Sequence, residues 1–370
     1  MSSERPSQDG PDERPTLEMP VVKRPEQESF PSGGSATKGA LDHEQDHEGN
    51  YLNDDAHLLD VQRGLLGVFD GVSQGGLGEI ASRTAKGELA KERLALWSEK
   101  SDPVSRSTNE RIEHVFGSTK SETPLIRAEV EGAMHDLLLR MDAVVGAAAA
   151  RAKKTNLPGW KSMATTAVIA KIWEDGQKKR FVTLGNIGDS RGYLLRDKKL
   201  LRLTHDQTFV QMLVDAHLLS DDEAIMTPLT KTEVLTAAAR RPELRRLYSY
   251  LEYLEKSEGK ETFTVNDISN MVLQSVGSSP VLKVDDLTLT PEIVTREVEV
   301  GNLIILTTDG VHGNLVDEKI AKFAARFTHD AQGLADALVN GALDFTLQHD
   351  PKNEPRLHSD DMTTVVIKID

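Results

Sequence analysis

The sequence has 370 residues, and its 44 Lys and Arg against 59 Asp and Glu leave a net charge of −15. This balance argues against a nucleic-acid binder, which needs cations to neutralise phosphates, and against docking on an anionic membrane. The absence of cysteine excludes a disulfide scaffold, a zinc ribbon and a thiol nucleophile. No segment approaches the roughly 20 apolar residues of a transmembrane helix, and the polar N-terminus lacks a signal peptide's apolar core. We therefore expect a cytoplasmic protein.

The first 40 residues have the composition of an unfolded segment. They hold six of the 15 prolines, with charges, Ser and Gly between them. A segment with so few apolar residues cannot offset its ordering entropy by burial. We predict a disordered, acidic, Pro-rich tail over residues 1–40 and a folded domain over residues 41–370, interrupted by a helical insertion at about residues 228–267.

Short runs rich in Leu or β-branched residues, bounded by Gly or Asp, predict β-strands. They cover residues 56–60, 65–69, 165–172, 181–186, 192–195, 303–308 and 363–369. Apolar periodicity predicts helices over residues 79–98 and 124–153, and a capping-box pattern predicts a third helix from Ser220. Because the strands come in adjacent pairs with helices between pairs, the pattern favours a layered α+β fold over a strictly alternating α/β fold.

The predicted insertion contains a candidate helix that opens at Pro242, a favourable first helical position. Its apolar stripe consists of Leu244, Leu247, Tyr248, Leu251 and Leu254. We interpret this stripe as a helix packed on the core; a mobile flap near a site and a partner-docking helix are the alternatives.

Acidic residues gather at the ends of the predicted strands. Two strands end in Asp-Gly, at Asp70-Gly71 and at Asp309-Gly310. Further acids precede or follow other strands, namely Asp54, Asp55, Asp189, Asp360 and Asp361. Taken alone, each Asp-Gly is most simply a turn, but two at strand ends beside further acids suggest one shared site.

Such a cluster needs cations if its members converge. Two carboxylates about 4 Å apart repel by about 4 kcal/mol at an effective dielectric constant of 20. Carboxylate, carbonyl and water ligands select hard ions, Mg²⁺ or Mn²⁺, over Zn²⁺ or copper. The spacing of the acids therefore predicts a carboxylate-lined divalent-metal site.

Several of these segments together resemble the motifs of the PPM-type (type 2C) metal-dependent protein serine/threonine phosphatases, in that family's order. They are Asn53-Asp54-Asp55-Ala56, Val68-Phe69-Asp70-Gly71-Val72, Thr165-Thr166-Ala167-Val168, Asn186-Ile187-Gly188-Asp189-Ser190-Arg191, Leu203-Thr204-His205-Asp206, Leu306-Thr307-Thr308-Asp309-Gly310 and Asp360-Asp361-Met362-Thr363-Thr364-Val365-Val366. The resemblance covers roughly residues 35–370, apart from the insertion. It implies a four-layer α-β-β-α sandwich, in which two antiparallel sheets are flanked by helices.

The resemblance also implies roles for the acids. Asp70 would bridge two metal ions, and the carbonyl of Gly71 would bind one of them. Asp309 and Asp360 would hold the other ion, and Asp54 would reach the second ion directly or through water.

Three further positions follow from the same resemblance. Asp55 comes next to Asp54 in the metal-binding set, and Asp189 would help to hold a third, weaker ion. Arg191 would be structural and pair with an acid.

The implied activity is hydrolysis of phosphoserine and phosphothreonine by direct attack of a water or hydroxide that bridges two Mg²⁺ or Mn²⁺ ions. Asp70, Asp309 and Asp360 would act through the bound metals and water. The substrates would be phosphorylated signalling proteins, and we expect a monomer that binds neither nucleic acid nor membrane.

Two departures from the family pattern concern the phosphate. Asn50 stands where many members have a phosphate-binding Arg, for which Lys38 or Arg63 are possible substitutes. Val72 stands where many members have a His proposed as general acid. In addition, Asp361 replaces the more common Asn.

Two other functions stay open. A haloacid-dehalogenase-like phosphatase has a similar nucleophile loop, but it needs a second Asp where this chain has Val72. A catalytically silent, phosphatase-like binding or regulatory module would keep the fold and act by docking.

The histidines suggest less. The zinc-protease pattern at residues 43–47 lies in a polar stretch between glycines, so we interpret it as a solvated loop. We interpret His205 and His312, which lie near motif residues, as structural.

Overall fold

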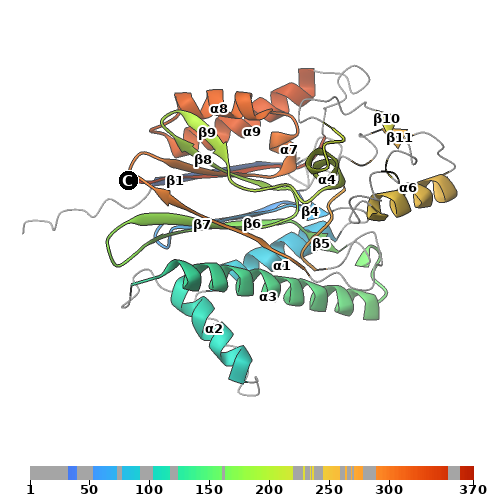
Figure 1. The fold of residues 1–370 in the computed structure, drawn as a ribbon, viewed down its shortest axis with the longest axis horizontal. Coiled ribbons are helices and arrows are strands. Elements are labelled where there is room, and N and C mark those ends of the chain that lie inside the picture. The colour runs from blue at the N-terminus through green and yellow to red at the C-terminus, as the bar shows by residue number, and fades with distance from the viewer. Residues whose placement is uncertain are drawn as a thin grey trace, which may run out of the picture.

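The computed structural model describes residues 32–39, 53–72, 77–91, 103–116, 124–160, 163–219, 228–229, 234, 236, 245–258, 263–264, 268, 271–277, 289–348 and 359–370. These residues form two antiparallel sheets packed face to face, with helices on both outer faces (Figure 1). The predicted α+β sandwich of four layers is therefore confirmed.

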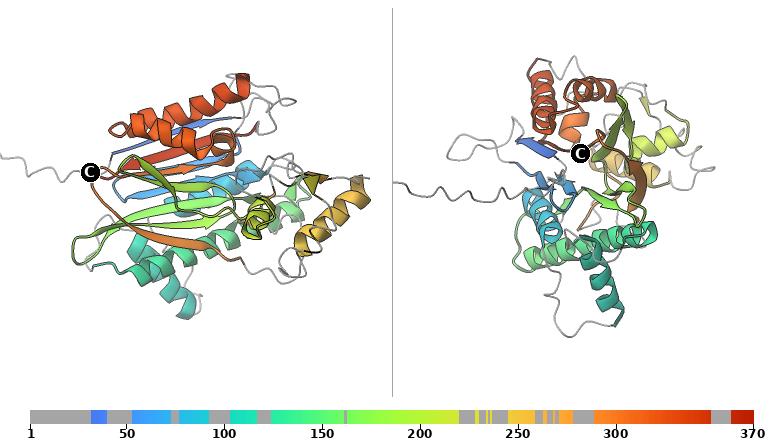
Figure 2. Two further views of the ribbon diagram at one scale, coloured as in Figure 1. Left: turned by 45° about the horizontal axis from the view of Figure 1, so that its top comes forward. Right: turned by 90° about the vertical axis from the view of Figure 1, so that its left-hand side faces the viewer.

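The first sheet has the strand order β1-β14-β13-β8-β9. Its strands are β1 (Ser32–Lys38), β14 (Met362–Lys368), β13 (Leu303–Thr307), β8 (Arg191–Arg196) and β9 (Lys199–Arg202). Its outer face is covered by α7 (Asp309–His312), α8 (Asp317–Arg326) and α9 (Ala331–Gln348). Figure 2 shows this helical layer and the sheet beneath it from two further directions.

The second sheet has the strand order β12-β7-β6-β3-β2. Its strands are β12 (Glu292–Val298), β7 (Arg180–Ile187), β6 (Ala167–Glu174), β3 (Leu65–Phe69) and β2 (Ala56–Asp60). The helices α1 (Gly78–Ala90) and α3 (Arg127–Lys154) pack on its outer face, and α2 (Pro103–Phe116) packs on α3. A short pair, β4 (Gly71–Val72) with β5 (Ala164–Thr165), extends beyond the end of β3.

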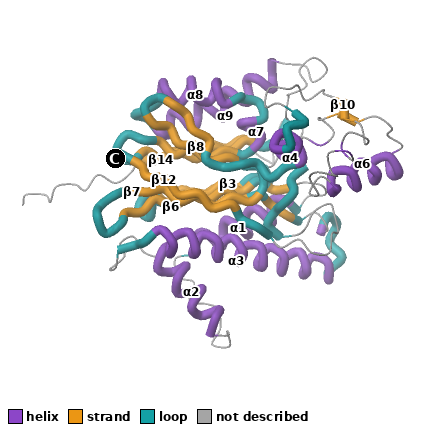
Figure 3. Tube along the Cα trace, viewed as in Figure 1, coloured by secondary structure: helices purple, strands orange, loops and turns teal. Residues whose placement is uncertain are grey.

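The space between the sheets is filled by alternate apolar residues of both. On β6, Val168 and Ala170 face the other sheet, whereas Ala167 and Ile169 face α3. This period of two is what a sheet buried on both faces requires. Helix, strand and loop are distinguished in Figure 3, where the two sheets lie as a central double layer.

The insertion carries β10 (Pro228–Leu229), α6 (Arg245–Glu258) and β11 (Phe263–Thr264). Pro228 pairs with Thr264, so β10 and β11 bring the two ends of the insertion together. Leu247 and Leu251 of α6 are fully buried against Phe209 and Leu213 of α4 (Phe209–Asp215). Leu247 and Leu251 thus pack on a small cluster with α4, separate from the clusters of the sandwich, and the side chains of Leu244 and Leu254 lie outside the described residues.

The predicted tail extends too far. Residues 32–38 form the edge strand β1, which pairs along its whole length with β14, from Ser32 opposite Lys368 to Lys38 opposite Met362. The run Ser-Gly-Gly-Ser-Ala-Thr-Lys lacks the apolar residues that predict a strand, yet Gly34 is required there. A Cβ on Gly34 would lie 2.3 Å from Cα of Gln332, so the strand approaches α9 too closely for a side chain. The boundary at residue 40 is therefore wrong, and residues 1–31 lie outside the described residues.

Other predicted elements need smaller corrections. The strand predicted at residues 165–172 is divided between β5 and β6, because Thr166 turns its hydroxyl and its amide toward Asp70 and Ser190. The helix predicted over residues 79–98 ends at Ala90, and residues 92–98 lie outside the described residues. The predicted helix start at Ser220, the residue Pro242 and the zinc-protease pattern at residues 43–47 also lie outside the described residues.

Candidate active site

The strand register brings the acidic motifs to one end of both sheets. In the second sheet, Ala56 at the start of β2 lies opposite Phe69 at the end of β3, and Ala167 lies opposite Ile187 at the end of β7. In the first sheet, Thr307 at the end of β13 lies opposite Thr364 near the start of β14. The acids that precede or follow these strand ends therefore meet at a common edge, which we call the acidic edge.

Two glycines set how closely the loops of the acidic edge approach one another. A Cβ on Gly71 would lie 2.6 Å from the carbonyl oxygen of Asp54, and a Cβ on Gly310 would lie 2.0 Å from that of Asp361. Only a residue without a side chain fits at such distances. Asp54 is thus held beside Gly71, and the Asp309-Gly310 turn is held against Asp361.

Backbone and hydroxyl hydrogen bonds fix Asp54 and Asp55. The amide of Asp54 donates to Oδ2 of Asp361 at 2.5 Å, and Oγ of Ser82 donates to the carbonyl of Asp54 at 2.5 Å. Thr308 donates its hydroxyl to Oδ2 of Asp55 at 2.8 Å. The other oxygen of Asp55, Oδ1, is buried and accepts no hydrogen bond from the described residues.

Asp70 lies at the centre of the acidic edge. Burial raises the pKa of its carboxyl well above the ordinary value, and the charges of four other aspartates raise it further. Those neighbours are Asp309, Asp55, Asp360 and Asp189. A carboxyl that is both buried and surrounded by like charges favours its protonated form unless cations offset the repulsion.

Threonines hold the backbone around Asp70. The carbonyl of Asp70 accepts from the amide of Thr166 at 2.8 Å and from the hydroxyl of Thr165 at 2.7 Å. Oγ1 of Thr166 also lies 2.8 Å from Oγ of Ser190, the residue after Asp189. This chain of contacts ties the Asp189 loop to Asp70.

A second aspartate on the other side of the edge has a similarly shifted pKa. Burial raises the pKa of Asp55 well above its ordinary value, and the neighbouring Asp361 raises it further. Asp361 is itself only 1% exposed. Its carboxylate therefore adds a charge to the cluster as well as accepting the Asp54 amide.

The donor set suits hard divalent ions. Four other aspartates at the acidic edge lie near enough to Asp70 to raise its pKa, and Asp55 keeps a buried oxygen that accepts no hydrogen bond from the part of the chain described. Carboxylate oxygens are the ligands that Mg²⁺ and Mn²⁺ prefer. Within the described ranges, however, no three Asp, Glu or His side chains are arranged closely enough to hold an ion as they stand. The metal-ligand roles of Asp54, Asp55, Asp70, Gly71, Asp189, Asp309 and Asp360 stay predictions.

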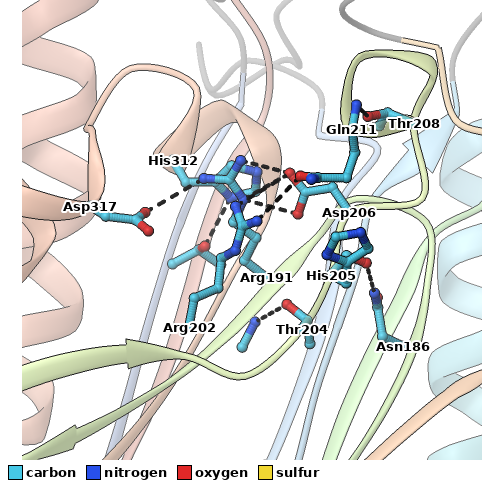
Figure 4. Close-up of polar contacts among 12 residues, drawn as sticks. Asn186, Arg191, Arg202, Thr204, His205, Asp206, Thr208, Gln211, His312 and Asp317 are labelled. Atoms are coloured by element: carbon cyan, nitrogen blue, oxygen red, sulfur yellow. Dashed lines mark hydrogen bonds and ion pairs between the residues drawn. The ribbon is translucent and has the colours of Figure 1, made fainter. Parts of the chain in front are cut away.

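An ion-pair network around Asp206 begins at Arg191, two residues after Asp189 (Figure 4). Asp206 is buried and Arg191 is half-buried. Arg191 donates from Nη2 to Oδ2 of Asp206 at 2.6 Å, and its Nη1 lies 3.5 Å from Oδ1 of Asp317. Although burial alone raises the pKa of Asp206, the guanidinium of Arg191 outweighs it and holds that pKa below its ordinary value. The pairing with an acid that was predicted for Arg191 is therefore confirmed.

The two nearby histidines also have structural contacts. Nδ1 of His312 lies 3.0 Å from Oγ1 of Thr307, and burial with the adjacent Arg191 lowers the pKa of His312 to about 3. His312 is therefore neutral near pH 7 and unsuited to donate a proton as a general acid. Nε2 of the exposed His205 lies 2.9 Å from Asp215.

The two suggested substitutes for a phosphate-binding Arg differ in position. Lys38 lies opposite Met362, next to Asp361 and thus at the acidic edge. Arg63 lies in the β2–β3 turn at the opposite end of the second sheet, where its Nε lies 2.6 Å from Asp60. Arg63 is therefore the wrong candidate.

Sequence reasoning missed the hydroxyl groups that hold Asp55 and Asp70 in place. Thr308, Thr165 and Thr166 lie inside the recognised motifs, but no pattern in the chain assigned them a partner. Thr308 and Asp55 are 253 positions apart. Asp206 was likewise named only as part of a motif, although its position after a strand and near Arg191 is the signal that could have found it.

Comparison with known proteins supports one family. No family model matches the sequence. The serine/threonine protein phosphatase PstP of Mycobacterium tuberculosis is 41% identical over 109 residues, which is 27% of this chain and 20% of that protein. The chain thus spans only a small part of this curated relative's length.

Solved structures extend the similarity to nearly the whole chain. The crystal structure of M. tuberculosis PstP covers 92% of this chain and 100% of that one, with a TM-score of 0.53 and 19% identity. Stp1 of Staphylococcus aureus covers 92% and 96%, with a TM-score of 0.56 and 17% identity. The PPM phosphatase MsPP of Mycobacterium smegmatis covers 92% and 100%, with a TM-score of 0.52 and 19% identity.

At these identities the solved structures establish a shared fold. None of the described helices is long and apolar enough to cross a membrane. In its fold, and over the matched stretch of its sequence, the chain resembles the PPM-type (type 2C) serine/threonine protein phosphatases.

Proposed function

We propose that this protein is a metal-dependent phosphatase that hydrolyses phosphoserine and phosphothreonine in phosphorylated proteins. The observation that carries the proposal is the gathering of Asp309, Asp55, Asp360 and Asp189 near enough to Asp70 for each to raise its pKa. Asp55 and Asp189 are buried there, and the other three aspartates are half-buried. A folded protein keeps such mutual repulsion where the charges have a use, and perturbed carboxyls gather at functional sites. The fold shared with serine/threonine phosphatases supports the same conclusion.

The residues of the acidic edge would have different roles. Asp70, Gly71 and Asp54 come from the second sheet, whereas Asp309 and Asp360 come from the first. When bound, two hard divalent ions, Mg²⁺ or Mn²⁺, would supply an activated water for direct attack on phosphorus and positive charge for the phosphoryl oxygens. The hydroxyl of Thr308 would hold the carboxylate of Asp55, and those of Thr165 and Thr166 would hold the backbone of Asp70. Asp189 would serve a third ion.

Lys38 is the proposed cation for the substrate phosphate, because its strand ends at the acidic edge. A Lys38→Ala variant should raise KM for a phosphopeptide while leaving kcat nearly unchanged. An unchanged KM would exclude this role.

The proposed function is tested by hydrolysis of p-nitrophenyl phosphate with Mn²⁺, with Mg²⁺ and with EDTA. We expect turnover with either metal, loss of turnover with EDTA, and little turnover by the Asp70→Asn variant. Full activity of Asp70→Asn would contradict the proposal. Absence of any turnover would support a silent binding module, and a phosphoryl group trapped on Asp70 would support a haloacid-dehalogenase-like mechanism.

Three further properties stay predictions. We expect the protein to act as a monomer, to bind neither nucleic acid nor membrane, and to work in the cytoplasm. Size-exclusion chromatography with light scattering tests the first, and a dimer mass would contradict it.

A further inference from the structure

A groove of about 390 Å³ lies between α8 and α9, in the helical layer outside the first sheet. Figure 1 shows these two helices side by side there. Its apolar lining consists of Leu315, Phe323, Gly341 and Phe345, and its polar lining of Lys319, Lys322, Arg326, Asp344 and Gln348. We call it the α8–α9 groove.

The apolar floor depends on a close approach of the two helices. Leu315 is 2% exposed, whereas Phe323 and Phe345 are half-buried and so remain partly open to a ligand. A Cβ on Gly341 would lie 2.9 Å from Cζ of Phe323, so the glycine lets that ring lie against α9. The groove thus presents two aromatic surfaces to solvent.

One wall of the groove is a row of cations. Lys319, Lys322 and Arg326 are exposed and follow one another at helical spacings of three and four residues, which places them on one face of α8. None of the three forms an ion pair with another described residue, although Nζ of Lys319 lies 4.5 Å above the Phe345 ring. Asp344 is the acid that lines the same groove.

The positive charge of this wall is opposite in sign to the net charge of the chain. A protein with a net charge of −15 gains nothing in solubility from a cluster of exposed cations around aromatic rings. Such a combination complements a ligand that is itself anionic and partly apolar. The three cations span about 10 Å along the helix, which equals about three residues of an extended peptide.

The groove is connected to the acidic edge. Leu315 at its floor lies three residues beyond His312, the last residue of α7, and α7 begins at Asp309. Both α7 and α8 pack on α9. A peptide seated in the groove would therefore lie on the same helical layer as α7, the helix that begins at Asp309.

We propose that the α8–α9 groove docks an acidic segment, with an apolar anchor residue, of a phosphoprotein substrate. Carboxylates spaced over about three residues would face Lys319, Lys322 and Arg326, and the anchor would pack on Phe323 and Phe345. This inference rests on the proposed function for the identity of the partner. The groove itself is tested independently of catalysis.

The binding test uses the full chain and a short fluorescein-labelled peptide of alternating Asp and Phe, without phosphate, in EDTA. Fluorescence anisotropy should show salt-sensitive binding that falls at least tenfold in the Lys322→Glu/Arg326→Glu variant. The matched control is Lys198→Glu/Lys199→Glu, a pair of exposed cations on the β8–β9 turn. Equal binding by the wild type and the groove variant, or an equal loss in the control, would overturn the proposal.

The kinetic test asks whether docking serves catalysis. With a phosphothreonine peptide extended by the same acidic segment, the groove variant should show a KM raised about tenfold and an unchanged kcat. Its hydrolysis of p-nitrophenyl phosphate should match the wild type. An unchanged KM would overturn the substrate-docking role even if hydrolysis itself is normal.

Two results would reassign the groove. A synthetic peptide of residues 1–31 that binds the groove more tightly than the acidic probe would make the chain's own N-terminal segment the occupant. Groove-dependent binding to vesicles rich in phosphatidylserine, without binding of the acidic peptide, would make it a lipid contact. If hydrolysis is absent but the acidic probe binds through the groove, the proposed function fails and the docking surface stands.

Discussion

Arg191 and Asp206 form a largely buried bidentate ion pair: Nε of Arg191 lies 3.1 Å from both carboxylate oxygens of Asp206, and Nη2 lies 2.6 Å from Oδ2. Arg202 approaches the same carboxylate at 3.7 Å. Because Arg191 opens β8 two residues after Asp189, and Asp206 precedes α4, the pair connects the acidic edge to the helix on which the insertion packs.

This pair should show strong coupling in a double-mutant cycle. Replacing Asp206 by Leu leaves the half-buried Arg191 guanidinium with the more distant Asp317, at 3.5 Å, as its remaining carboxylate among the described residues. We therefore expect a loss of about 3 kcal/mol in the free energy of unfolding. Arg191→Met should cost a similar amount, whereas the double variant should recover much of the loss. Urea unfolding of the four proteins measures this, and simple additivity of the two single losses would contradict it.

The acidic edge should destabilise the metal-free protein. Asp70 is half-buried among four like charges that raise its pKa, so Asp70→Asn should raise the free energy of unfolding in EDTA by about 1 kcal/mol. Mg²⁺ or Mn²⁺ should then raise the melting temperature of the wild type but not that of Asp70→Asn. Thermal unfolding in EDTA and in metal measures both effects.

Asp197→Asn is the matched control for this prediction. Asp197 is an exposed aspartate in a turn, with φ of 50°, a conformation that Asn also tolerates. The stability of the Asp197→Asn variant in EDTA should equal that of the wild type, and so should the rise of its melting temperature with metal. A metal response that survives in Asp70→Asn would contradict the metal role of the acidic edge.

The sequence predicted in outline that the acidic residues lie together, but it did not predict the side chains that hold them in place. The strands at residues 56–60 and 65–69 were predicted with their observed bounds, since each is an apolar or alternating run that ends at Asp. The acids beside them were therefore placed at strand ends correctly. Which strand ends meet depends on sheet order, and the contact of Thr308 with Asp55 joins residues far apart in the chain.

The edge strand β1 shows a second limit of prediction from the sequence. Local composition predicted disorder over residues 1–40, yet Ser32–Lys38 is held by backbone pairing to β14 and by contact with α9. Backbone hydrogen bonds do not depend on side-chain type, so a strand can form from Gly, Ser and Thr. Its sequence then lacks the apolar alternation by which strands are predicted. Tertiary context overrides propensity at such an edge.

Truncation should distinguish the true boundary of the fold. Removing residues 1–31 should leave the melting temperature nearly unchanged. Removing residues 1–38 also deletes β1 and its register with β14, so we expect a fall of many degrees. Calorimetry of the two truncated chains measures this, and a large fall with the shorter truncation would contradict it.

Gly34 gives a finer test of the same strand. A side chain there meets the backbone of Gln332, so Gly34→Val should destabilise the protein by about 1–3 kcal/mol through overpacking. Gly87 in α1 is the matched control, because a Cβ there meets no described atom within 4 Å apart from its own stretch of helix. Gly87→Ala should be neutral or slightly stabilising, and denaturant unfolding compares the two variants. A Gly34→Val variant as stable as the wild type would contradict the close approach of β1 to α9.

Lys171 should make stability depend on pH in the alkaline range. Its Nζ donates to the carbonyl of Arg63 at 2.6 Å, and burial lowers the pKa of Lys171 from 10.5 to about 8. Between those pH values the unfolded chain holds a proton that the folded protein has released. Stability due to this group therefore rises with pH, by up to about 1.4 kcal/mol per pH unit.

The Lys171→Met variant should lack this dependence. The difference in unfolding free energy between wild type and variant should shift in favour of the wild type as the pH rises from 8 to 10.5. Lys199→Met, at an exposed lysine of β9, should keep the wild-type slope. Urea unfolding at a series of pH values gives the slopes, and identical slopes for Lys171→Met and wild type would contradict the assignment.

The central claim is that distant aspartates form one metal-dependent catalytic centre, and phosphate release from a phosphothreonine peptide tests it most directly. Full-length wild type with Mn²⁺ should release phosphate, whereas EDTA, Asp70→Asn and Asp309→Asn should each reduce the rate by orders of magnitude. Folding of the two variants is verified by circular dichroism. Equal rates with and without metal, or in the folded Asp70→Asn variant, would contradict the account.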